Sequence, residues 1–512
     1  MSRRTVLVFI LCAVMAVGAG GAVNAQSPAG SRGRSLVIVQ GQDPQNWDPI
    51  ATFLLSWGMV GCQIFDGLVD RGTDLKLRPG LATSWSTPDD GLTWMFKLRQ
   101  GVTFHDGEPF DAAAVKFTFD RLLGPEGAKG PQQGNYKSID HVQVVDPSTV
   151  KMVMKVKDPV IITKLAGYGA MIVPPKYVQE HGSAYFGANP VGTGPFKFVE
   201  YRKDDHLTLA ANRTYWNGAP RVSAVTYRFV PEAATRVAEL QAGRADIAQG
   251  VPVSQSSVVK GDANLALLPV GSPTVLEIRF DPSKAPAGDV RFRRAVIAAI
   301  DVQKIIDTIL QGYGHRVSTF QSPLSFGNDA SLKPYPYDPA RAKSLLAEAG
   351  IRAGTEVSLS FPSNNADFRE AAQAMVSYLG AAGLKLTLTP VEQVTYFSDV
   401  LPHAKTGQIY EFGWGGWTLD FDNTAYLLYH KGEFWNPVFS DAEVEKYLDA
   451  ERTTNDQRTR LKAFQALDRR LYDLAIDFPL WQSVNLWGVN KRVDGFVAPP
   501  DDRVRLLAVA TK

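Results

Sequence analysis

Apolar and polar positions between residues 81 and 123 predict a strand followed by a helix. Along the strand, the apolar residues Leu92, Trp94, Phe96 and Leu98 alternate with Thr93, Met95, Lys97 and Arg99. This period of two is typical of a half-buried strand. Farther along the chain, Asp111 can cap a helix in which Val115, Phe119 and Leu122 share one face. The pattern by itself indicates a hairpin and an amphipathic helix.

Two other stretches read as strand–helix–strand units. In the first, a strand at Val225–Val230 leads through the helical segment ATRVAELQA to a strand that begins at Ala245. In the second, Val357–Phe361 leads through FREAAQAMVSYLGAAG to Leu384–Leu388. Crossovers of this kind make parallel strands in a sheet that helices cover. Because the two units lie far apart in the chain, we expect two separate α/β lobes.

The N-terminus has the pattern of an export signal. Arg3 and Arg4 precede an apolar run, Val6–Val17, that is too short to span a bilayer permanently. The segment Val23-Asn24-Ala25 then supplies the small residues that signal peptidase accepts. We therefore predict a cleavable signal peptide at residues 1–25; a membrane anchor is the alternative.

The residues around this signal refine the prediction. Phe9, Ile10 and Leu11 are too bulky for a lipobox before Cys12, so the mature protein is not expected to be lipidated. The first residues partly match a twin-arginine signal. With no cofactor motif to load before export, we favour the general secretory route. A flexible leader at residues 26–33 would follow, and the expected location is the periplasm.

Composition narrows the classes of partner. The 512-residue chain has 54 basic and 52 acidic residues, and loss of Arg3 and Arg4 leaves 52 of each. A mature charge of zero argues against nucleic acid or an anionic membrane as the partner. Cys12 would leave with the signal, so Cys62 has no disulfide partner and stability must come from apolar burial.

Motifs for catalysis or metal binding do not stand out. We find no Gly-x-Ser-x-Gly elbow, no phosphate loop and no histidine pair at metal-ligand spacing. The seven histidines are scattered at His105, His141, His181, His206, His315, His403 and His430. We expect neither an enzyme nor a bound metal or cofactor.

The segment from Trp414 to Asn423, WGGWTLDFDN, is the strongest candidate for a binding site. Glycines among tryptophans make a poor core strand, but they suit an aromatic wall that a ligand approaches closely. Asp420 beside Trp417 offers a carboxylate and a ring to a ligand cation. The alternative is a strand end at which Asp420 and Asp422 cap the following helix, and the residues alone do not decide between the two.

A second candidate lies in the loop at residues 41–53, which follows a strand at Leu36–Val39. Loops at the carboxyl ends of strands are where α/β lobes bind ligands. Trp47 in this loop is therefore a candidate for the facing wall of a site, with core packing as the alternative.

The string from Leu81 to Leu123 closely resembles the signature of the family 5 extracellular solute-binding proteins, the peptide, nickel and oligopeptide receptors of bacterial ABC importers. The resemblance continues at Pro190–Pro220, in ATRVAELQAGRADIA and in DVRFRRAVIAAIDVQKIIDTILQG, so it covers essentially the whole mature chain. It implies an α/β, two-lobed type II periplasmic-binding-protein fold with a ligand cleft between the lobes. The implied ranges are 34–78, 192–272 and 485–512 for lobe I, 79–191 for a domain inserted in lobe I, and 273–484 for lobe II.

The resemblance also bears on the site. Peptide-binding members carry Gly-Trp-x-x-Asp, whose aspartate holds the ammonium group of the peptide, and Gly416, Trp417 and Asp420 match that motif. Members often continue Asp-x-x-Asp-Pro, which this chain lacks, and Ser358–Pro362 lacks the arginine of dipeptide receptors. These departures point to a different or longer solute that bears a positive group. The predicted ligand-binding residues are Trp47, Trp414, Gly416, Trp417, Asp420 and Asp422.

We therefore expect a monomeric exported receptor that delivers a peptide-like or other small solute to ABC permease and ATPase subunits in the inner membrane. One alternative is a receptor for an oligosaccharide or another neutral solute stacked on Trp417, Trp414 and Trp47. Another is a secreted hydrolase with Asp420 and Asp422 as paired carboxylates. A chaperone-like or signalling role of the same fold is a third.

Overall fold

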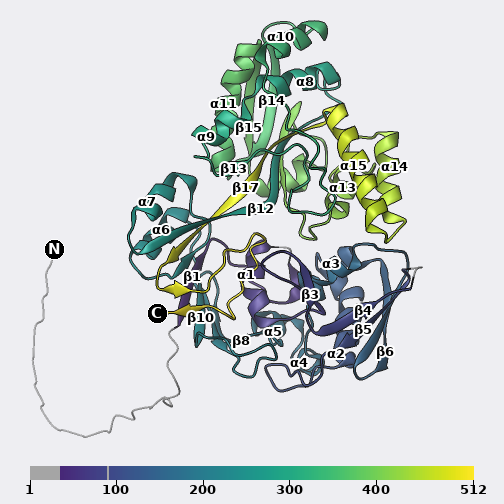
Figure 1. Ribbon diagram of the computed structural model, residues 1–512, viewed down its shortest axis with the longest axis vertical. Coiled ribbons are helices and arrows are strands. Elements are labelled where there is room, and N and C mark those ends of the chain that lie inside the picture. Colours follow the sequence, from purple (N-terminus) through teal and green to yellow (C-terminus); the bar gives the residue numbers. More distant parts are fainter. Residues whose placement is uncertain (1–34, 53, 89–90) are drawn as a thin grey trace, which may run out of the picture. The chain divides into compact units, whose positions relative to one another are not determined.

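The computed structural model describes residues 35–52, 54–88 and 91–512 (Figure 1). The predicted signal peptide and leader lie outside the described residues. In the described ranges, no helix is long and apolar enough to cross a bilayer.

One large mixed sheet organises most of the chain. Its strand order is β15 (Leu384–Val391), β14 (Thr355–Pro362), β16 (Ile409–Trp414), β12 (Leu265–Phe280), β17 (Asp477–Asn490), β11 (Ile247–Ala248), β1 (Leu36–Gln40), β10 (Ala224–Phe229), β9 (His206–Ala211) and β8 (Phe196–Arg202), and β13 (Gly314–His315) pairs with β17. The predicted strand–helix–strand units are present. Helix α6 (Ala233–Gln241) joins β10 to β11, which both run parallel to β1, and α11 (Ala366–Ala382) joins the parallel neighbours β14 and β15.

Strands β12 and β17 pass through both halves of this sheet (Figure 1). They pair antiparallel from Leu265 opposite Asn490 to Gly271 opposite Val484, and again from Val275 opposite Gln482. Between Gly271 and Val275 the register shifts, so regular pairing is interrupted where the strands leave one half of the sheet and enter the other. Irregular pairing of this kind permits bending.

The predicted strand is β5 (Thr93–Leu98) of a separate four-stranded sheet, whose order is β4 (Ala82–Ser86), β5, β7 (Thr149–Met154) and β6 (Ile139–Asp146). The predicted capped helix follows this strand along the chain. Asp111 caps α2 (Ala112–Leu123) by accepting from the backbone N–H groups of Ala113 and Ala114. Phe96 and Leu98 are buried as the alternation predicts, whereas Leu92 lies before the strand and is exposed. The short pairs β2 (Val69–Arg71) with β3 (Leu77–Pro79) and β18 (Val493–Asp494) with β19 (Ala510–Thr511) complete the sheets.

The remaining α-helices are α1 (Leu55–Ile64), α3 (Ile161–Leu165), α4 (Pro175–His181), α5 (Ser183–Ala188), α7 (Ser256–Gly261), α8 (Val290–Ala299), α9 (Val302–Thr308), α10 (Pro339–Glu348), α12 (Gln393–Thr395), α13 (Phe421–Tyr429), α14 (Ala442–Arg452) and α15 (Gln457–Leu474). Two apolar cores surround β14 and β16 and take all their buried members from residues 275–481. Another core joins β1 and β10 to residues 168–186, so the segment predicted as an insertion shares a core with lobe I.

Residues 275–481 therefore have apolar cores of their own, and β12 and β17 connect them to the half of the sheet that contains β1. The predicted domain boundaries themselves stay a prediction, and we keep the names lobe I, inserted domain and lobe II for the ranges given above.

Candidate functional site

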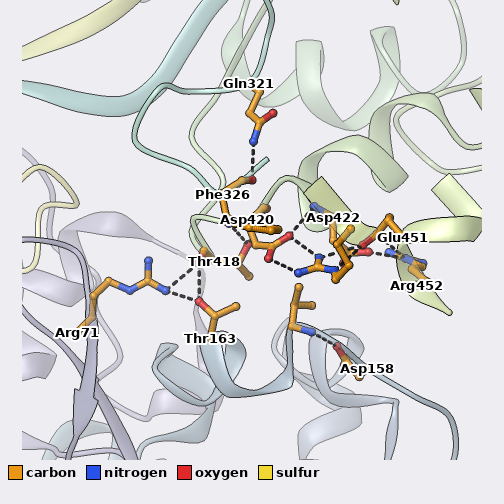
Figure 2. Close-up of polar contacts among 12 residues, drawn as sticks. Arg71, Asp158, Thr163, Gln321, Phe326, Thr418, Asp420, Asp422, Glu451 and Arg452 are labelled. Atoms are coloured by element: carbon orange, nitrogen blue, oxygen red, sulfur yellow. Dashed lines mark hydrogen bonds and ion pairs between the residues drawn. The ribbon is translucent and has the colours of Figure 1, made fainter. Parts of the chain in front are cut away.

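The loop between β16 and α13 carries most of the predicted site, and one of its carbonyls contacts the inserted domain and lobe I. The backbone oxygen of Thr418 accepts from Thr163 Oγ1 at 2.6 Å and from Arg71 Nη2 at 2.8 Å (Figure 2). Arg71 Nη2 also donates to Thr163 Oγ1 at 2.6 Å. Burial, followed by the charge of Arg503, lowers the pKa of Arg71 to about 9, which leaves the guanidinium charged at neutral pH. A lobe II loop is thus tied to the other two parts of the chain.

Asp420 lies at the start of α13 and is largely buried, with 8 % of its surface exposed. Its Oδ1 accepts from the backbone N–H of Asp422, which caps the helix. Both carboxylate oxygens also accept from Arg460, Oδ2 from Nη1 at 2.8 Å and Oδ1 from Nη2 at 2.7 Å. These contacts match the helix-cap interpretation of Asp420. A ligand cation would have to compete with Arg460 for the carboxylate, so the predicted ammonium contact stays a prediction.

Asp422 belongs to the same buried network. Its Oδ1 accepts from Arg452 Nε at 2.5 Å (Figure 2), while Arg460 also donates to Glu451 Oε2. Burial, and then hydrogen bonding to Asp422, raises the pKa of Glu451 to about 10. Burial opposes ionisation of Asp422, but the hydrogen bond from Glu451 and the charge of Arg452 hold the pKa of Asp422 below its usual range. Arg452 binds Asp422 and Arg460 binds Glu451, so the network is a structural one.

Two pockets border the Thr418 loop. The first, called here the hinge-side pocket, has about 380 Å³ of empty volume. It is lined by Tyr168, Ser272, Pro273, Thr274, Gly415, Gly416, Trp417, Leu419, Pro500, Asp501, Asp502 and Arg503. The lining comes from the inserted domain, from the irregular stretch of β12, from lobe II and from the C-terminal loop of lobe I. Gly416 and Trp417 are the predicted site residues that it brings together.

The second pocket, which Thr418 itself lines, has about 1090 Å³ of empty volume. It is lined by Arg71, Leu75, Leu77, Trp85, Trp94, Pro159, Ile162, Thr163, Leu324, Phe326, Thr418, Leu419, Asp420, Asn455, Gln457 and Arg460. Leu419 lines both pockets and has a positive φ of 55°. Asp420 contributes to this second pocket, and its carboxylate meets Arg460 there.

Trp417 contacts the opposite wall closely. A Cβ atom added at Gly167 would lie only 2.4 Å from Cζ3 of Trp417, so the indole lies against the backbone of Gly167 in the inserted domain. A glycine is needed at this position because any side chain would meet the ring. Half-buried Trp417 therefore joins lobe II to the inserted domain while lining the hinge-side pocket.

Trp414 and Trp47 line neither of these pockets. Trp414 is half-buried and packs at 6.0 Å from Phe412 and 6.4 Å from Trp435, measured between ring centroids. Trp47 is fully buried, with its ring 5.7 Å from that of Tyr201, in the core beneath β1 and β10. The second interpretation of Trp47, core packing, fits these contacts, and contact of either tryptophan with a ligand stays a prediction.

A model of a known family matches residues 76–436, and its description is "Bacterial extracellular solute-binding proteins, family 5 Middle". The chain belongs to family 5 of the bacterial extracellular solute-binding proteins. The predicted family, the α/β periplasmic-binding-protein fold and the role in solute uptake by ABC importers are thereby confirmed.

Individual family 5 proteins resemble this chain over most of its length. The glutathione-binding protein GsiB of Pectobacterium atrosepticum is 30 % identical over 456 residues, 86 % of this chain and 87 % of the relative. GsiB of Salmonella typhimurium is 28 % identical over 480 residues, 91 % and 93 % of the two chains. Among solved structures, HbpA2 from Haemophilus parasuis has a TM-score of 0.83 at 26 % identity and covers 94 % of this chain and 100 % of that one. AgaA of A. tumefaciens R10, in complex with agropinic acid, has a TM-score of 0.77 at 26 % identity over 94 % and 99 % of the chains.

Sequence reasoning about this family 5 protein missed the C-terminal loop. Asp501, Asp502 and Arg503 line the hinge-side pocket, yet they lie far along the chain from the Trp417 segment. The sequence feature that could have pointed to this loop is the pair of adjacent acids after Pro499 and Pro500. A run of this kind is also typical of an ordinary surface turn, so it does not single out a binding site. Tyr168 gave no signal at all, because its place in the pocket depends on the packing of the inserted domain.

Proposed function

We propose that this chain is an exported periplasmic receptor that captures a peptide-like solute in the hinge-side pocket and delivers it, as a monomer, to an ABC permease and its ATPase. The signal peptide at residues 1–25 would direct export and then be removed. The observation that carries the proposal is the origin of the pocket lining, which comes from lobe II, the inserted domain, lobe I and β12 together.

The pocket lies where ligand binding can be coupled to bending. β12 contributes Ser272, Pro273 and Thr274, the residues at which its pairing with β17 is interrupted. A solute that contacts both lobes stabilises their approach, and a solute that contacts one lobe does not. The bonds from Thr163 and Arg71 to the Thr418 oxygen are made by the same approach and would add to it.

The relatives support a small peptide as the solute. GsiB, at 28–30 % identity, is named as glutathione-binding, and glutathione is a tripeptide. Stacking of a neutral sugar on three tryptophans is less well supported, because Trp417 lines the pocket and Trp414 and Trp47 do not.

The solute would leave chemically unaltered. The hydrolase alternative needs Asp420 and Asp422 as a free acid–base pair, whereas Arg460 binds the first and Arg452 binds the second. Carboxylates held in this way stabilise the start of α13. Energy for transport would come from ATP hydrolysis in the partner subunits.

Calorimetric titration tests the proposal with glutathione, trialanine and maltotriose. Expected are saturable one-to-one binding of at least one peptide, weakened by added salt, and no change in its mass after long incubation. Native mass spectrometry of protein isolated from its own periplasm is expected to show a bound peptide-like mass. Binding of maltotriose alone, release of a cleaved product, or no binding by any of the three would overturn the proposal.

A further inference from the structure

The segment Trp417–Thr418 of lobe II docks on two residues outside lobe II. The ring of Trp417 lies against the backbone of Gly167, where an added Cβ atom would come within 2.4 Å of Cζ3. The carbonyl of Thr418 accepts from Arg71 Nη2 at 2.8 Å (Figure 2). Gly167 and Arg71 are called here the docking residues. Because they receive lobe II, their own positions decide how well the lobes can meet.

Arg503, on the C-terminal loop of lobe I, binds the chain on both sides of Gly167. Its guanidinium donates to the carbonyl of Ala166, the residue before Gly167. It also lies 4.9 Å from the ring centre of Tyr168, the residue after Gly167. Arg503 itself is buried, and its Nε lies 3.5 Å from a carboxylate oxygen of Asp501. A guanidinium with several partners is a rigid group, so it fixes the backbone at this docking residue.

Arg505, two residues farther along the same loop, binds the backbone of the other docking residue. Its Nη2 donates to the carbonyl of Arg71 at 2.5 Å and lies 3.5 Å from Oδ1 of Asp70. Its Nη1 donates to the carbonyl of Arg503 at 2.9 Å, which links the two arginines. One short segment of the C-terminal loop therefore holds the backbone at both docking residues.

An open space borders this arrangement. A third pocket, with about 930 Å³ of empty volume, is lined by Ala166, Gly167, Arg503 and Arg505 among other residues, and all of its lining residues fall outside the lobe II range. Atoms beside empty space lack packing partners on that side. The backbone at Gly167 can therefore shift toward this pocket unless the hydrogen bond from Arg503 restrains it.

We propose that Arg503 and Arg505 are positioning residues for lobe closure. They hold Gly167 and Arg71 where Trp417 and Thr418 of lobe II meet them, and in this way they strengthen solute binding. The effect on affinity rests on the proposed function, whereas the effect on the docking of lobe II does not.

Hydrogen exchange of the full mature chain, followed by mass spectrometry, tests the docking without added solute. In Arg503→Met and in Arg505→Met, we expect peptides that cover residues 415–420 of lobe II to exchange about three- to tenfold faster than in wild type. Among the described residues, neither arginine donates a hydrogen bond to residues 415–420. A role confined to the C-terminal loop would therefore leave their exchange unchanged.

Two further variants make the exchange measurement specific. Arg221→Met is the matched control, because Arg221 is exposed and donates to the carbonyl of Ala508 at 3.3 Å, in the same C-terminal segment but at neither docking residue. It is expected to exchange as wild type does. Arg505→Lys keeps an ammonium group that can donate to the Arg71 carbonyl, so we expect its exchange to lie closer to wild type than that of Arg505→Met. If Arg503→Met does not fold, this pair of variants at half-buried Arg505 decides the question.

Calorimetric titration with glutathione and trialanine measures the effect on affinity. Each methionine variant is expected to bind the peptide that wild type binds about five- to tenfold more weakly. In a Trp417→Ala background, Arg503→Met is expected to change the affinity less than about twofold, because Gly167 then has no ring to receive. A merely structural role of Arg503 would instead weaken binding equally in both backgrounds.

The outcomes separate this inference from the proposed function. Unchanged exchange of residues 415–420 in both methionine variants, or faster exchange with unchanged affinity, overturns the inference and leaves the proposed function in place. If wild type binds none of glutathione, trialanine and maltotriose, the proposed function fails. The exchange measurement still decides in that case whether the two arginines hold the docking residues.

Discussion

Arg460 binds both carboxylate oxygens of Asp420 at 2.8 and 2.7 Å, and the same guanidinium donates to Glu451 at 2.9 Å. Arg460 lies in α15 and Asp420 at the start of α13, so this contact fastens the site loop to the helices behind it. The partners are 2 % and 8 % exposed, and a bidentate pair at such depth fixes its members in place. The loop that carries Trp417 is therefore held in a defined position before any solute arrives.

Removing Arg460 should destabilise the protein strongly. Arg460→Met leaves the carboxylate of Asp420 buried without a cation, and we expect a loss of about 3–5 kcal/mol in the free energy of unfolding. Urea unfolding followed by circular dichroism measures it. Arg458→Met, which alters an exposed arginine on the same helix, serves as the control. A variant as stable as wild type would show that the pair does not hold the loop.

The contact of Thr163 with Thr418 should affect affinity more than stability. Thr163→Val keeps the shape but removes the donor to a carbonyl of lobe II, and a bond of this kind contributes about 0.5–1.5 kcal/mol. Because the bond forms only when the lobes meet, we expect roughly two- to tenfold weaker solute binding by calorimetry. Thr83→Val, which removes an exposed hydroxyl bonded at 3.2 Å to the Lys97 carbonyl, should leave affinity unchanged. Equal affinities of both variants would exclude the Thr418 contact from the bound state.

Periodic patterns predicted the framework of the fold because they record local burial. One parallel unit consists of β14, α11 and β15. The apolar pattern that predicted each of these elements lies within a few residues of the element itself. Asp111 was identifiable as a cap for the same reason, since its partners Ala113 and Ala114 follow it directly.

The site was only partly predictable because its contacts join distant segments. Asp420 fits both a helix cap and an ammonium ligand, and the feature that separates them is Arg460, which sequence spacing does not place beside it. Asp502 and Trp417 line the same pocket although 85 residues of sequence separate them, and sequence spacing does not reveal this. Trp47 was a candidate because loops at the carboxyl ends of strands often bind ligands. In the structure its ring packs beside Tyr201 and Phe229 in a core.

Stability should fall as the pH rises through the neutral range, and Glu411 is one cause. Glu411 is 3 % exposed, and burial raises its pKa to about 8 from the usual value of 4.5. Below pH 4.5 Glu411 is protonated in both the folded and unfolded states, so its burial does not lower the free energy of unfolding through ionisation. Between about pH 4.5 and 8 the unfolded state ionises first, so stability is lost progressively as the pH rises.

Glu411→Gln removes this dependence. We expect the variant to be more stable than wild type at pH 8 by about 1–3 kcal/mol, given 1.36 kcal/mol for each unit of pKa shift and partial relaxation of the site. At pH 4.5 the two should be nearly equal. Thermal unfolding across this pH range measures the difference, with the exposed Glu180→Gln as control. A constant difference at all pH values would assign the effect to packing instead of ionisation.

Trp417 and Trp414 stand three residues apart in the predicted site, and the structure gives them different roles. Trp417 lines the hinge-side pocket and lies on Gly167, whereas Trp414 packs on Phe412 and Trp435 inside lobe II. Trp417→Ala should therefore weaken binding of a cationic peptide by about 1–2 kcal/mol, the sum of a lost ring face and a lost lobe contact. Trp414→Ala should lower the melting temperature and leave the affinity of the folded protein within about twofold.

The conservative change Trp417→Phe separates the two contributions of the ring. Phenylalanine keeps an aromatic face for the solute cation but is too short to reach Gly167 in the same way, so we expect an intermediate affinity. The N-acetylated peptide, which lacks the cation, should show a smaller loss in Trp417→Ala than the free peptide does. Equal losses for the two peptides would mean that Trp417 acts through the contact between lobe II and the inserted domain, since that contact does not depend on the charge of the solute.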